Sequence, residues 1–285
     1  DIMILMQSLA RGLVVEPYIA NVILAGGILK RVGNEAQKEQ WLQPMIAGEL
    51  QATLAFNEPQ SRYELASVAT SATRDGDHWV LDGHKGLVLN GGTSDLLLIP
   101  ARTAGDVGDE HGITLFAVAA DSDGLSCEAY ATVDGLRAAE IKLEAVRLSG
   151  DAVLGNVDEG FAALAATFDD ATLAICAEAV GIMYTLKDKT VQYSKDRSQF
   201  GVPIGSFQVL QHRMVDMLMA CEQAQSLLMW AVMTNAEGGE EGKRAVSAMK
   251  YMIGTAGQKL GEEAVQIHGG MGVTWELDVA HYFKR

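Results

Sequence analysis

The chain has 285 residues, of which 48% are hydrophobic and 21% are charged, and its formal net charge at pH 7 is -15. A chain of this length can bury a substantial core and is long enough for about two domains. The excess of acidic residues would be repelled by nucleic-acid phosphates and by anionic membranes, so neither is an expected partner.

The first 49 residues have helical periodicity. Apolar residues recur three and four positions apart between Ile2 and Leu13, and a second apolar segment runs from Pro17 to about Val32. The following segment, EAQKEQWLQPMIAGE, is polar on one side and is expected to bend or end at Pro44. Residues 1–49 are therefore predicted to be part of an N-terminal helical domain.

Residues 50–155 have a hydrophobic period of two, which indicates β-strands. The alternation occurs in QATLAFN, ASVATSAT, HWVLD, KGLVLN, DLLLIP, GITLFAV, LSCEAYA and AAEIKLEAVRL. Turn residues stand at 74–77 and at Asp82-Gly83. Because no helical crossover separates the strands, a middle antiparallel β domain, built as a sandwich or barrel, is expected.

Residues 156–285 return to the helical period. Three long helices are predicted, at about 161–196, 207–237 and 242–267, and their apolar stripes allow them to pack as an antiparallel bundle. The predicted fold class is therefore α+β and multidomain, with an N-terminal helical domain, a middle antiparallel β domain and a C-terminal antiparallel helix bundle.

The three cysteines, Cys127, Cys176 and Cys221, are far apart and have no CxxC or metal-ligand spacing. The sequence therefore predicts reduced thiols in the core of a cytoplasmic protein, and no metal site. No run of about 18 uncharged apolar residues occurs, so no membrane-spanning helix is predicted.

The turn between the first two long helices, RSQFGVPIGSFQ at 197–208, is a candidate ligand site. Unpaired amides in the first turn of the second helix, with Arg197 near them, would suit a phosphate or pyrophosphate. The alternative is an arginine that only caps the turn or forms a surface salt bridge.

Three other stretches could also approach a ligand. A predicted strand ends at Asn57, and a second ends in LNGG, where glycines allow close approach of the backbone. The third predicted helix ends at Gly269 and Gly270 in AVQIHGGMGVTWE. His268, just before these glycines, is either a ligand or base, or a structural residue.

The order and spacing of these stretches resemble the acyl-CoA dehydrogenase family. The matching text is EAQKEQWLQPMIAGELQATLAFNEP, LNGG, RSQFGVPIGSFQ and AVQIHGGMGVTWE, and it covers nearly the whole chain. The resemblance implies a helical domain, a β domain and a four-helix bundle, with the first helices and the last helix of full-length members lacking. It also implies FAD as the cofactor and oxidation of an acyl-CoA to the trans-2-enoyl-CoA.

The resemblance further implies two groups of cofactor-binding residues. Phe56 and Asn57 would lie near the flavin ring, and Leu89 would close the second strand that faces it. The residues expected to contact FAD at the subunit boundary are Arg197, Phe200, Gln208, Gln266, Gly269 and Gly270. Cofactor binding would thus depend on a dimer or a tetramer. The resemblance also makes Ser61 and Asp169 the candidates for substrate binding.

The chain departs from the family pattern at several of these positions. Asn57 replaces a threonine that bonds the flavin, Leu89 cannot form the corresponding bond, and Leu87 replaces a tryptophan. The glycine-serine loop after Glu58-Pro59 is rewritten as QSRYE. Flavin is therefore expected to bind differently or more weakly.

The catalytic base is not evident in the chain. The resemblance places the glutamate of most members beyond Arg285, and Ala171 occupies the alternative position. The adjacent carboxylates Asp169 and Asp170 are the remaining candidates, with surface polarity of a helix as the alternative.

The rewritten loop also resembles the small subunits of bacterial pimeloyl-CoA or steroid-chain dehydrogenases, which pair with a larger homologous chain. The expected partners are an acyl-CoA from fatty acid or steroid side-chain degradation, an electron-transfer flavoprotein as acceptor, and either copies of this chain or a larger homologous subunit. A non-catalytic subunit of a heteromeric enzyme and an acyl-CoA oxidase remain open alternatives.

Overall fold

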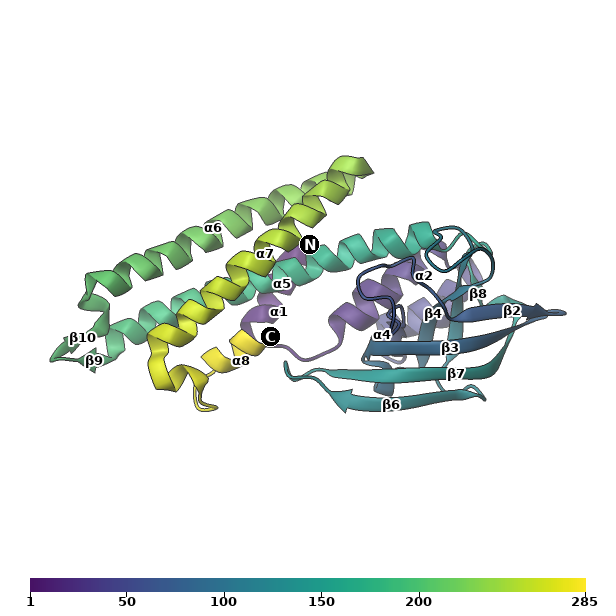
Figure 1. The fold of residues 1–285 in the computed structure, drawn as a ribbon, viewed down its shortest axis with the longest axis horizontal. Coiled ribbons are helices and arrows are strands. Elements are labelled where there is room, and N and C mark those ends of the chain that lie inside the picture. Colours follow the sequence, from purple (N-terminus) through teal and green to yellow (C-terminus); the bar gives the residue numbers. More distant parts are fainter. The chain divides into compact units, whose positions relative to one another are not determined.

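The structure is a computed structural model that describes residues 1–285. It consists of two compact units (Figure 1). The β unit comprises Glu16–Phe168, and the helical unit comprises Asp1–Val15 together with Asp169–Arg285. None of the helices is both long enough and apolar enough to cross a bilayer.

The β unit begins with a run of short helices. These are a π-helical segment at Ile19–Ala25, α2 at Gly26–Val32, α3 at Glu35–Gln37, a second π-helical segment at Lys38–Leu42 and α4 at Gln43–Ala47. Asn34 and Gln37 form a reciprocal capping box at the start of α3. The chain stays helical past Pro44, which lies in the first turn of α4, directly after the second π-helical segment.

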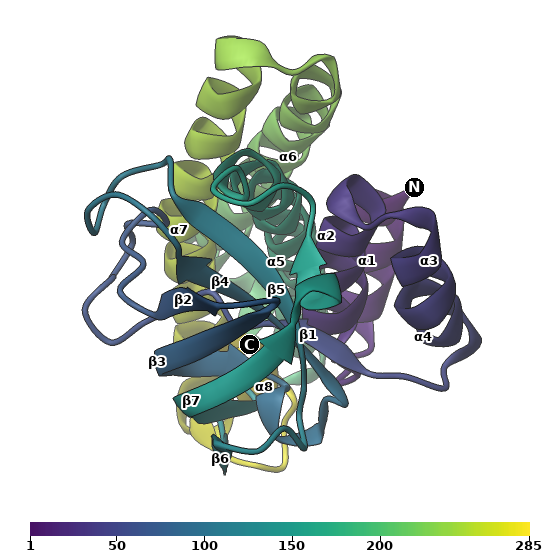
Figure 2. The ribbon, with the colours of Figure 1, turned by 90° about the vertical axis from the view of Figure 1, so that its right-hand side faces the viewer.

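One eight-stranded sheet follows in the β unit, which also contains the start of α5 up to Phe168 (Figure 2). Its strands are β1 at Ala52–Leu54, β2 at Ser71–Asp75, β3 at His78–Leu89, β4 at Leu96–Arg102, β5 at Ile113–Ala119, β6 at Leu125–Ala131, β7 at Arg137–Ser149 and β8 at Val153–Leu154. The order is β6-β7-β3-β2-β4-β5-β8, and β1 pairs with β4. Most pairs are antiparallel, but β1 and β2 both pair in parallel with β4, so the sheet is mixed.

The turn predicted at Asp82-Gly83 is wrong. Both residues lie inside the continuous strand β3, where the register with β7 shifts between Leu81 and Gly83. A Cβ at Gly83 would come within 2.5 Å of the Thr70 hydroxyl, so this glycine serves a close approach between segments. Asp82 accepts a hydrogen bond from the backbone N–H of Ala145 at 2.8 Å.

The helical unit contains the long helices. Its elements are α1 at Ile2–Arg11, the part of α5 (Phe161–Asp196) from Asp169 onward, the short strands β9 at Ser198–Gln199 and β10 at Val202–Pro203, α6 at Gln208–Glu237, α7 at Gly239–His268 and α8 at Val279–Lys284. The buried stripe of α6 includes Met217, Cys221, Ala224 and Leu228, as the sequence predicts.

One cysteine prediction is wrong. Cys176 and Cys221 are buried, but Cys127 is exposed on β6, because β6 is the edge strand of the sheet and only its first residue is even partly covered.

Candidate functional site

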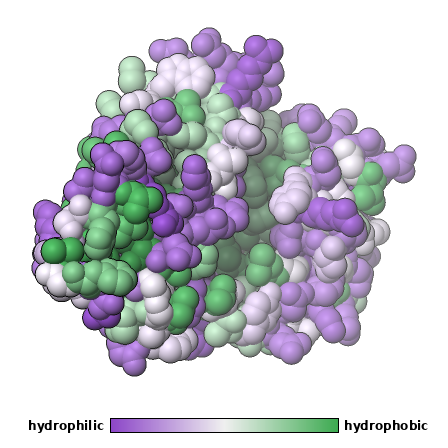
Figure 3. Space-filling model, turned by 60° about the vertical axis from the view of Figure 1, so that its left-hand side comes forward, coloured by the Kyte–Doolittle hydropathy of each residue, from purple (hydrophilic) through white to green (hydrophobic).

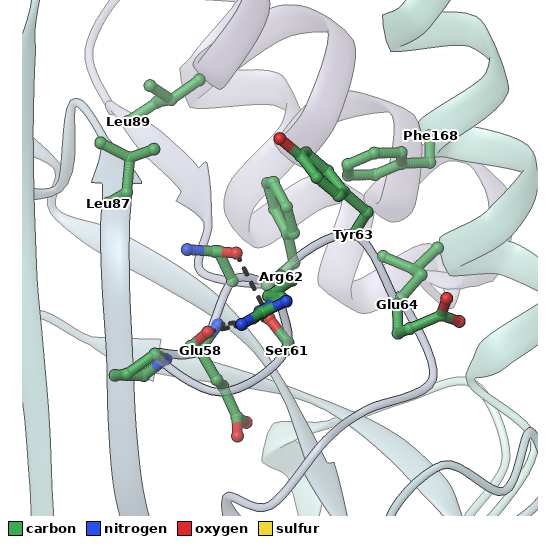
Figure 4. A pocket seen from close by; sticks show the side chains of 12 residues that line it. Glu58, Ser61, Arg62, Tyr63, Glu64, Leu87, Leu89 and Phe168 are labelled. Atoms are coloured by element: carbon green, nitrogen blue, oxygen red, sulfur yellow. Dashed lines mark hydrogen bonds between the residues drawn. The ribbon is translucent and has the colours of Figure 1, made fainter.

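A cavity of about 740 Å³ lies in the β unit. It is bounded by the end of β1, the loop that follows it, the end of β3 and one residue of α5 (Figure 4). The lining residues are Phe56, Asn57, Glu58, Pro59, Ser61, Arg62, Tyr63, Glu64, Leu65, Leu87, Leu89 and Phe168. Its volume lies within the usual range of small-molecule sites, roughly 300–1,000 Å³.

The walls of the cavity are mainly apolar. Phe56 packs edge to face on Phe168, with ring centroids 4.7 Å apart. In Figure 4, Leu87 and Leu89 lie on one side of the cavity, and Tyr63 and Phe168 lie on the other. Such walls suit a flat ring system or an acyl chain.

A bulge in β3 places Leu87 at the cavity. The register of β3 with β7 shifts here, and Leu87 has a φ of 50°. Its backbone N–H donates to Glu140 Oε1 at 3.3 Å, and Glu140 also bonds His84 at 2.7 Å and Tyr130 at 3.1 Å. Partial burial would raise the pKa of Glu140, but the three hydrogen bonds lower it overall, and the bond from Leu87 has the largest effect among them. The charged carboxylate therefore holds the bulge.

The polar side chains of the cavity wall are largely occupied. Asn57 Nδ2 donates to Gly86 O at 3.2 Å, and Gly86 N donates to Asn57 O at 2.9 Å. The Ser61 hydroxyl contacts Asn57 Oδ1 at 3.3 Å and Glu58 O at 2.9 Å. Leu89 has no polar side chain, and its carbonyl accepts from Thr53. One N–H of the Asn57 amide thus remains for a ligand.

A buried ion pair closes the loop that forms one wall. Glu58 is 2% exposed and Lys85 is fully buried, with Glu58 Oε1 2.5 Å from Lys85 Nζ. Glu58 also accepts from the backbone N–H groups of Ala69 at 2.8 Å and Thr70 at 3.1 Å. Glu58, at the start of the loop of residues 59–68, therefore binds the backbone at the far end of the loop and closes it.

The pair keeps Glu58 ionised. Burial alone would raise the pKa of this carboxyl, but the charge and hydrogen bond of Lys85 and further hydrogen bonds lower it to about 2. Burial lowers the pKa of Lys85 from its usual value, and Glu58 opposes that shift. The two charges compensate each other beneath the cavity wall.

The other predicted cofactor residues lie in the helical unit. Arg197 follows the last turn of α5, and its guanidinium makes no hydrogen bond or ion pair within the chain. Phe200 is 92% exposed at the tip of the β9–β10 hairpin, with a φ of 54°, and packs edge to face on Phe207. Gln208 is the exposed first residue of α6. Figure 3 brings the side with this hairpin forward and shows hydrophobic side chains gathered among hydrophilic ones.

The C-terminal end of α7 lies beside the last turns of α5. Tyr193 stacks on His268 with ring centroids 4.3 Å apart, and Gly269 ends the helix with a φ of 62°. Gln266, Gly269 and Gly270 are exposed, and a Cβ at either glycine would meet nothing within 4 Å. His268 is buried and bonds Ala264 O at 2.7 Å, and burial lowers its pKa, which favours the structural interpretation of this residue.

The candidate carboxylates lie on α5. Asp170 accepts a hydrogen bond from Asn235 Nδ2 at 3.1 Å. Burial, and then the charge of Asp170, raises the pKa of Asp169. A raised pKa makes Asp169 a better proton acceptor than an ordinary aspartate, while Ala171 is buried and has no functional group.

The structure thus separates the predicted site residues into groups. Phe56, Asn57, Ser61 and Leu89 line the cavity. The substrate candidate Asp169 and the remaining cofactor candidates, from Arg197 to Gly270, belong to the helical unit. Sequence reasoning noted Leu87 and the rewritten loop only as departures and missed Phe168, Leu65 and the buried Lys85. A lysine inside an apolar strand pattern was the available signal for the ion pair. No three His, Cys, Asp or Glu side chains are grouped to hold a metal ion.

Comparison with known proteins gives consistent matches. The acyl-CoA dehydrogenase middle-domain model matches residues 53–146, and the acyl-CoA dehydrogenase C-terminal-domain model matches residues 158–285. A Mycobacterium tuberculosis protein named as an acyl-CoA dehydrogenase is 34% identical over 262 residues, which is 90% of this chain and 67% of that protein. The mitochondrial short-chain specific acyl-CoA dehydrogenase of Bos taurus is 30% identical over 287 aligned residues, covering 99% of this chain and 69% of the relative.

A solved structure also matches. Butyryl-CoA dehydrogenase from Megasphaera elsdenii superposes with a TM-score of 0.92 and 28% identity, covering 100% of this chain and 76% of that chain. The chain therefore spans about two thirds to three quarters of the proteins that it matches.

Proposed function

Because this chain belongs to the acyl-CoA dehydrogenase family, whose members are FAD-dependent oxidoreductases, we propose that it converts an acyl-CoA to the trans-2-enoyl-CoA. The observation that carries this proposal is the apolar cavity between Phe56, Phe168, Leu87 and Leu89. It collects the two strand ends that the sequence predicted to face the flavin.

The residues of the cavity fit FAD in part. Flat apolar walls suit the faces of an isoalloxazine ring, and the volume suits a ring of that size. The edge of the ring would find few donors, because Leu89 has none and Asn57 already uses one N–H on Gly86. We infer that this chain holds the ring mainly by packing, with Asn57 as the polar contact.

The reaction requires two hydrogens to leave the acyl group. A carboxylate removes the proton from Cα, and the electron pair of that C–H bond forms the Cα=Cβ double bond as the hydride leaves Cβ with its own electron pair. FAD, when bound, accepts that hydride. Within the chain, we propose Asp169 as the proton acceptor ahead of Asp170, because its pKa is raised and Asp170 is engaged with Asn235.

The exposed residues of the helical unit support a subunit-dependent cofactor site. Arg197 carries an unpaired guanidinium, and Phe200 projects from a hairpin tip. We infer that both contact the FAD of a neighbouring subunit, which is either a copy of this chain or a larger homologous chain. An electron-transfer flavoprotein is the proposed acceptor, and the free cysteines favour a reducing, cytoplasmic compartment.

A second candidate function is a non-catalytic subunit of a heteromeric acyl-CoA dehydrogenase. The apolar residues Leu89 and Ala171 favour it, since each stands where the family's chemistry uses a polar group. In this case the cavity would contribute to subunit assembly or bind a ligand, and a larger homologous chain would catalyse the reaction.

The test is anaerobic addition of an acyl-CoA to the FAD-loaded protein, with the flavin absorption followed over time. The proposed reaction bleaches the oxidised-flavin band and yields enoyl-CoA. Bleaching that occurs only after a larger homologous chain is added supports the second candidate, whereas a protein that takes up no FAD contradicts the first. Hydrogen peroxide formed in air would identify an oxidase.

A further inference from the structure

We propose that the guanidinium of Arg62 binds the pyrophosphate of the ligand that enters the cavity of the β unit. The inference rests on the proposed function, because FAD and acyl-CoA are the two proposed ligands and each carries a pyrophosphate. It assigns a specific task to the loop that replaces the family's glycine-serine sequence.

Arg62 is a cation at the cavity that no acidic side chain of the chain neutralises. Arg62 is the one basic residue among the lining residues. Glu58 does not compete for it, because its carboxylate lies 2.5 Å from Lys85 Nζ under the wall. Glu64 is the other acid of the lining, and it forms no ion pair with Arg62. The guanidinium therefore makes no hydrogen bond or ion pair within the chain and can bind a ligand anion.

The backbone holds Arg62 in place by bonds on both sides. Ser61 N donates to Glu58 O at 3.0 Å, and Glu64 N donates to Ser61 O at 2.9 Å. The Ser61 hydroxyl adds a bond to Glu58 O at 2.9 Å. These bonds form two consecutive tight turns, and the clamp of Glu58 on Ala69 and Thr70 fixes the far end of the loop. The base of the Arg62 side chain is therefore well positioned before any ligand binds.

Arg62 has a φ of 49°, in the left-handed region that favours glycine. An arginine here is less favourable for folding than a glycine would be. Strained positions of this kind are concentrated at ligand clamps, where the side chain contributes to binding. The conformation agrees with the assignment of Arg62 to a ligand, which rests on its place in the cavity lining and on its unpaired guanidinium.

The geometry of the wall favours a pyrophosphate over a smaller contact. Arg62 is exposed and lies between the apolar sides formed by Leu87 and Leu89 and by Tyr63 and Phe168 (Figure 4). An apolar part of the ligand fills the cavity, and its anionic part remains at the opening, where water is available. A guanidinium binds two phosphate oxygens in parallel, which an ammonium group does not do.

The experiment compares each ligand with a counterpart that lacks the pyrophosphate. Binding of FAD and riboflavin is measured by flavin fluorescence, and binding of butyryl-CoA and butyryl-N-acetylcysteamine by calorimetry. Arg62→Gly is expected to weaken FAD or butyryl-CoA binding about tenfold and to leave the counterpart unchanged. Loss with FAD identifies the cofactor as the source of the pyrophosphate, and loss with butyryl-CoA identifies the substrate.

Two further variants separate binding from folding. Arg62→Gly relieves the backbone strain, so its melting temperature should rise by a few degrees while affinity falls. Arg62→Lys should keep the charge and lose part of the affinity. Lys142→Ala removes an exposed cation of β7 that has no partner and is the matched charge control, with affinity unchanged.

The outcomes distinguish this inference from the proposed function. Equal affinity of the unchanged protein and Arg62→Gly for both pyrophosphate ligands overturns the role of Arg62 and leaves the function standing. An equal loss for riboflavin or for the short thioester also overturns it, because the cavity as a whole would then be damaged. Failure of the unchanged protein to bind any of the four ligands contradicts the proposed function itself.

Discussion

Tyr193 stacks on His268 with ring centroids 4.3 Å apart and 29° between the ring planes. The Tyr193 hydroxyl also donates to His268 O at 3.3 Å, and Tyr193 O accepts from the backbone N–H of Arg197 at 2.8 Å. Because Gly269 and Gly270 follow His268 directly, this contact joins the two most distinctive sequence motifs at one end of the helical unit.

Replacement of Tyr193 by alanine should disturb both motifs. Loss of the partly buried ring is expected to cost about 1–3 kcal/mol of unfolding free energy and to weaken FAD retention. Tyr193→Phe keeps the stacked ring and loses only the hydroxyl bond, so it should cost about 1 kcal/mol or less. Urea unfolding and flavin content after gel filtration measure the two effects. Equal flavin content in Tyr193→Ala would show that the stack does not organise the cofactor site.

Arg197→Ala tests the proposed role of the free guanidinium in FAD binding. Because the side chain is exposed and unpaired, its removal should change the unfolding free energy by less than about 0.5 kcal/mol. Flavin content should fall clearly, since a charge-assisted contact to phosphate is lost. Lys195→Ala, which removes an exposed charge two residues earlier, is the control and should retain flavin. A variant of Arg197 that keeps its full flavin content would refute the assignment.

The buried ion pair should show strong coupling. Lys85→Met leaves the Glu58 carboxylate buried without its cation, so a loss of about 3–5 kcal/mol is expected. The double variant Glu58→Gln with Lys85→Met removes both charges and should recover much of that loss. Guanidinium chloride unfolding of the single and double variants measures the coupling free energy. Additive losses would mean that the two side chains do not depend on each other.

The pH dependence of stability follows from Glu58. Its pKa is about 2 in the folded protein against an ordinary 4.5, so the unfolded chain binds the proton more readily. The stabilisation is fully present above pH 4.5 and is lost as the pH falls to about 2, in total about 3 kcal/mol. Unfolding free energies measured across this range should fall more steeply for the unchanged protein than for the Glu58→Gln, Lys85→Met double variant. Parallel curves would exclude Glu58 as the source.

The long helices were predictable because each has a continuous apolar stripe. The sequence placed α5 at about residues 161–196, where the structure has it, and α6 and α7 within three residues of their observed starts. The fold class is confirmed as well. The division into domains at residues 49 and 155 remains a prediction.

The errors arose where a residue served a partner far away in the sequence. Gly83 was taken for a turn residue, but it lies in β3 next to Thr70. Cys127 was placed in the core, although β6 became an edge strand. The parallel pairing of β1 with β4 was also not evident. Alternation identifies a strand but contains no information on which strand lies beside it.

The sequence by itself determined the family and the cofactor class, because local motifs and periodicity are properties of the chain order, while the two groups of candidate contacts remain predictions. Only the tertiary structure decided that Lys85 neutralises Glu58, that Phe168 meets Phe56 and that Arg62 remains an unpaired cation at the cavity. These relationships depend on distances between residues that are remote along the chain, and packing sets those distances.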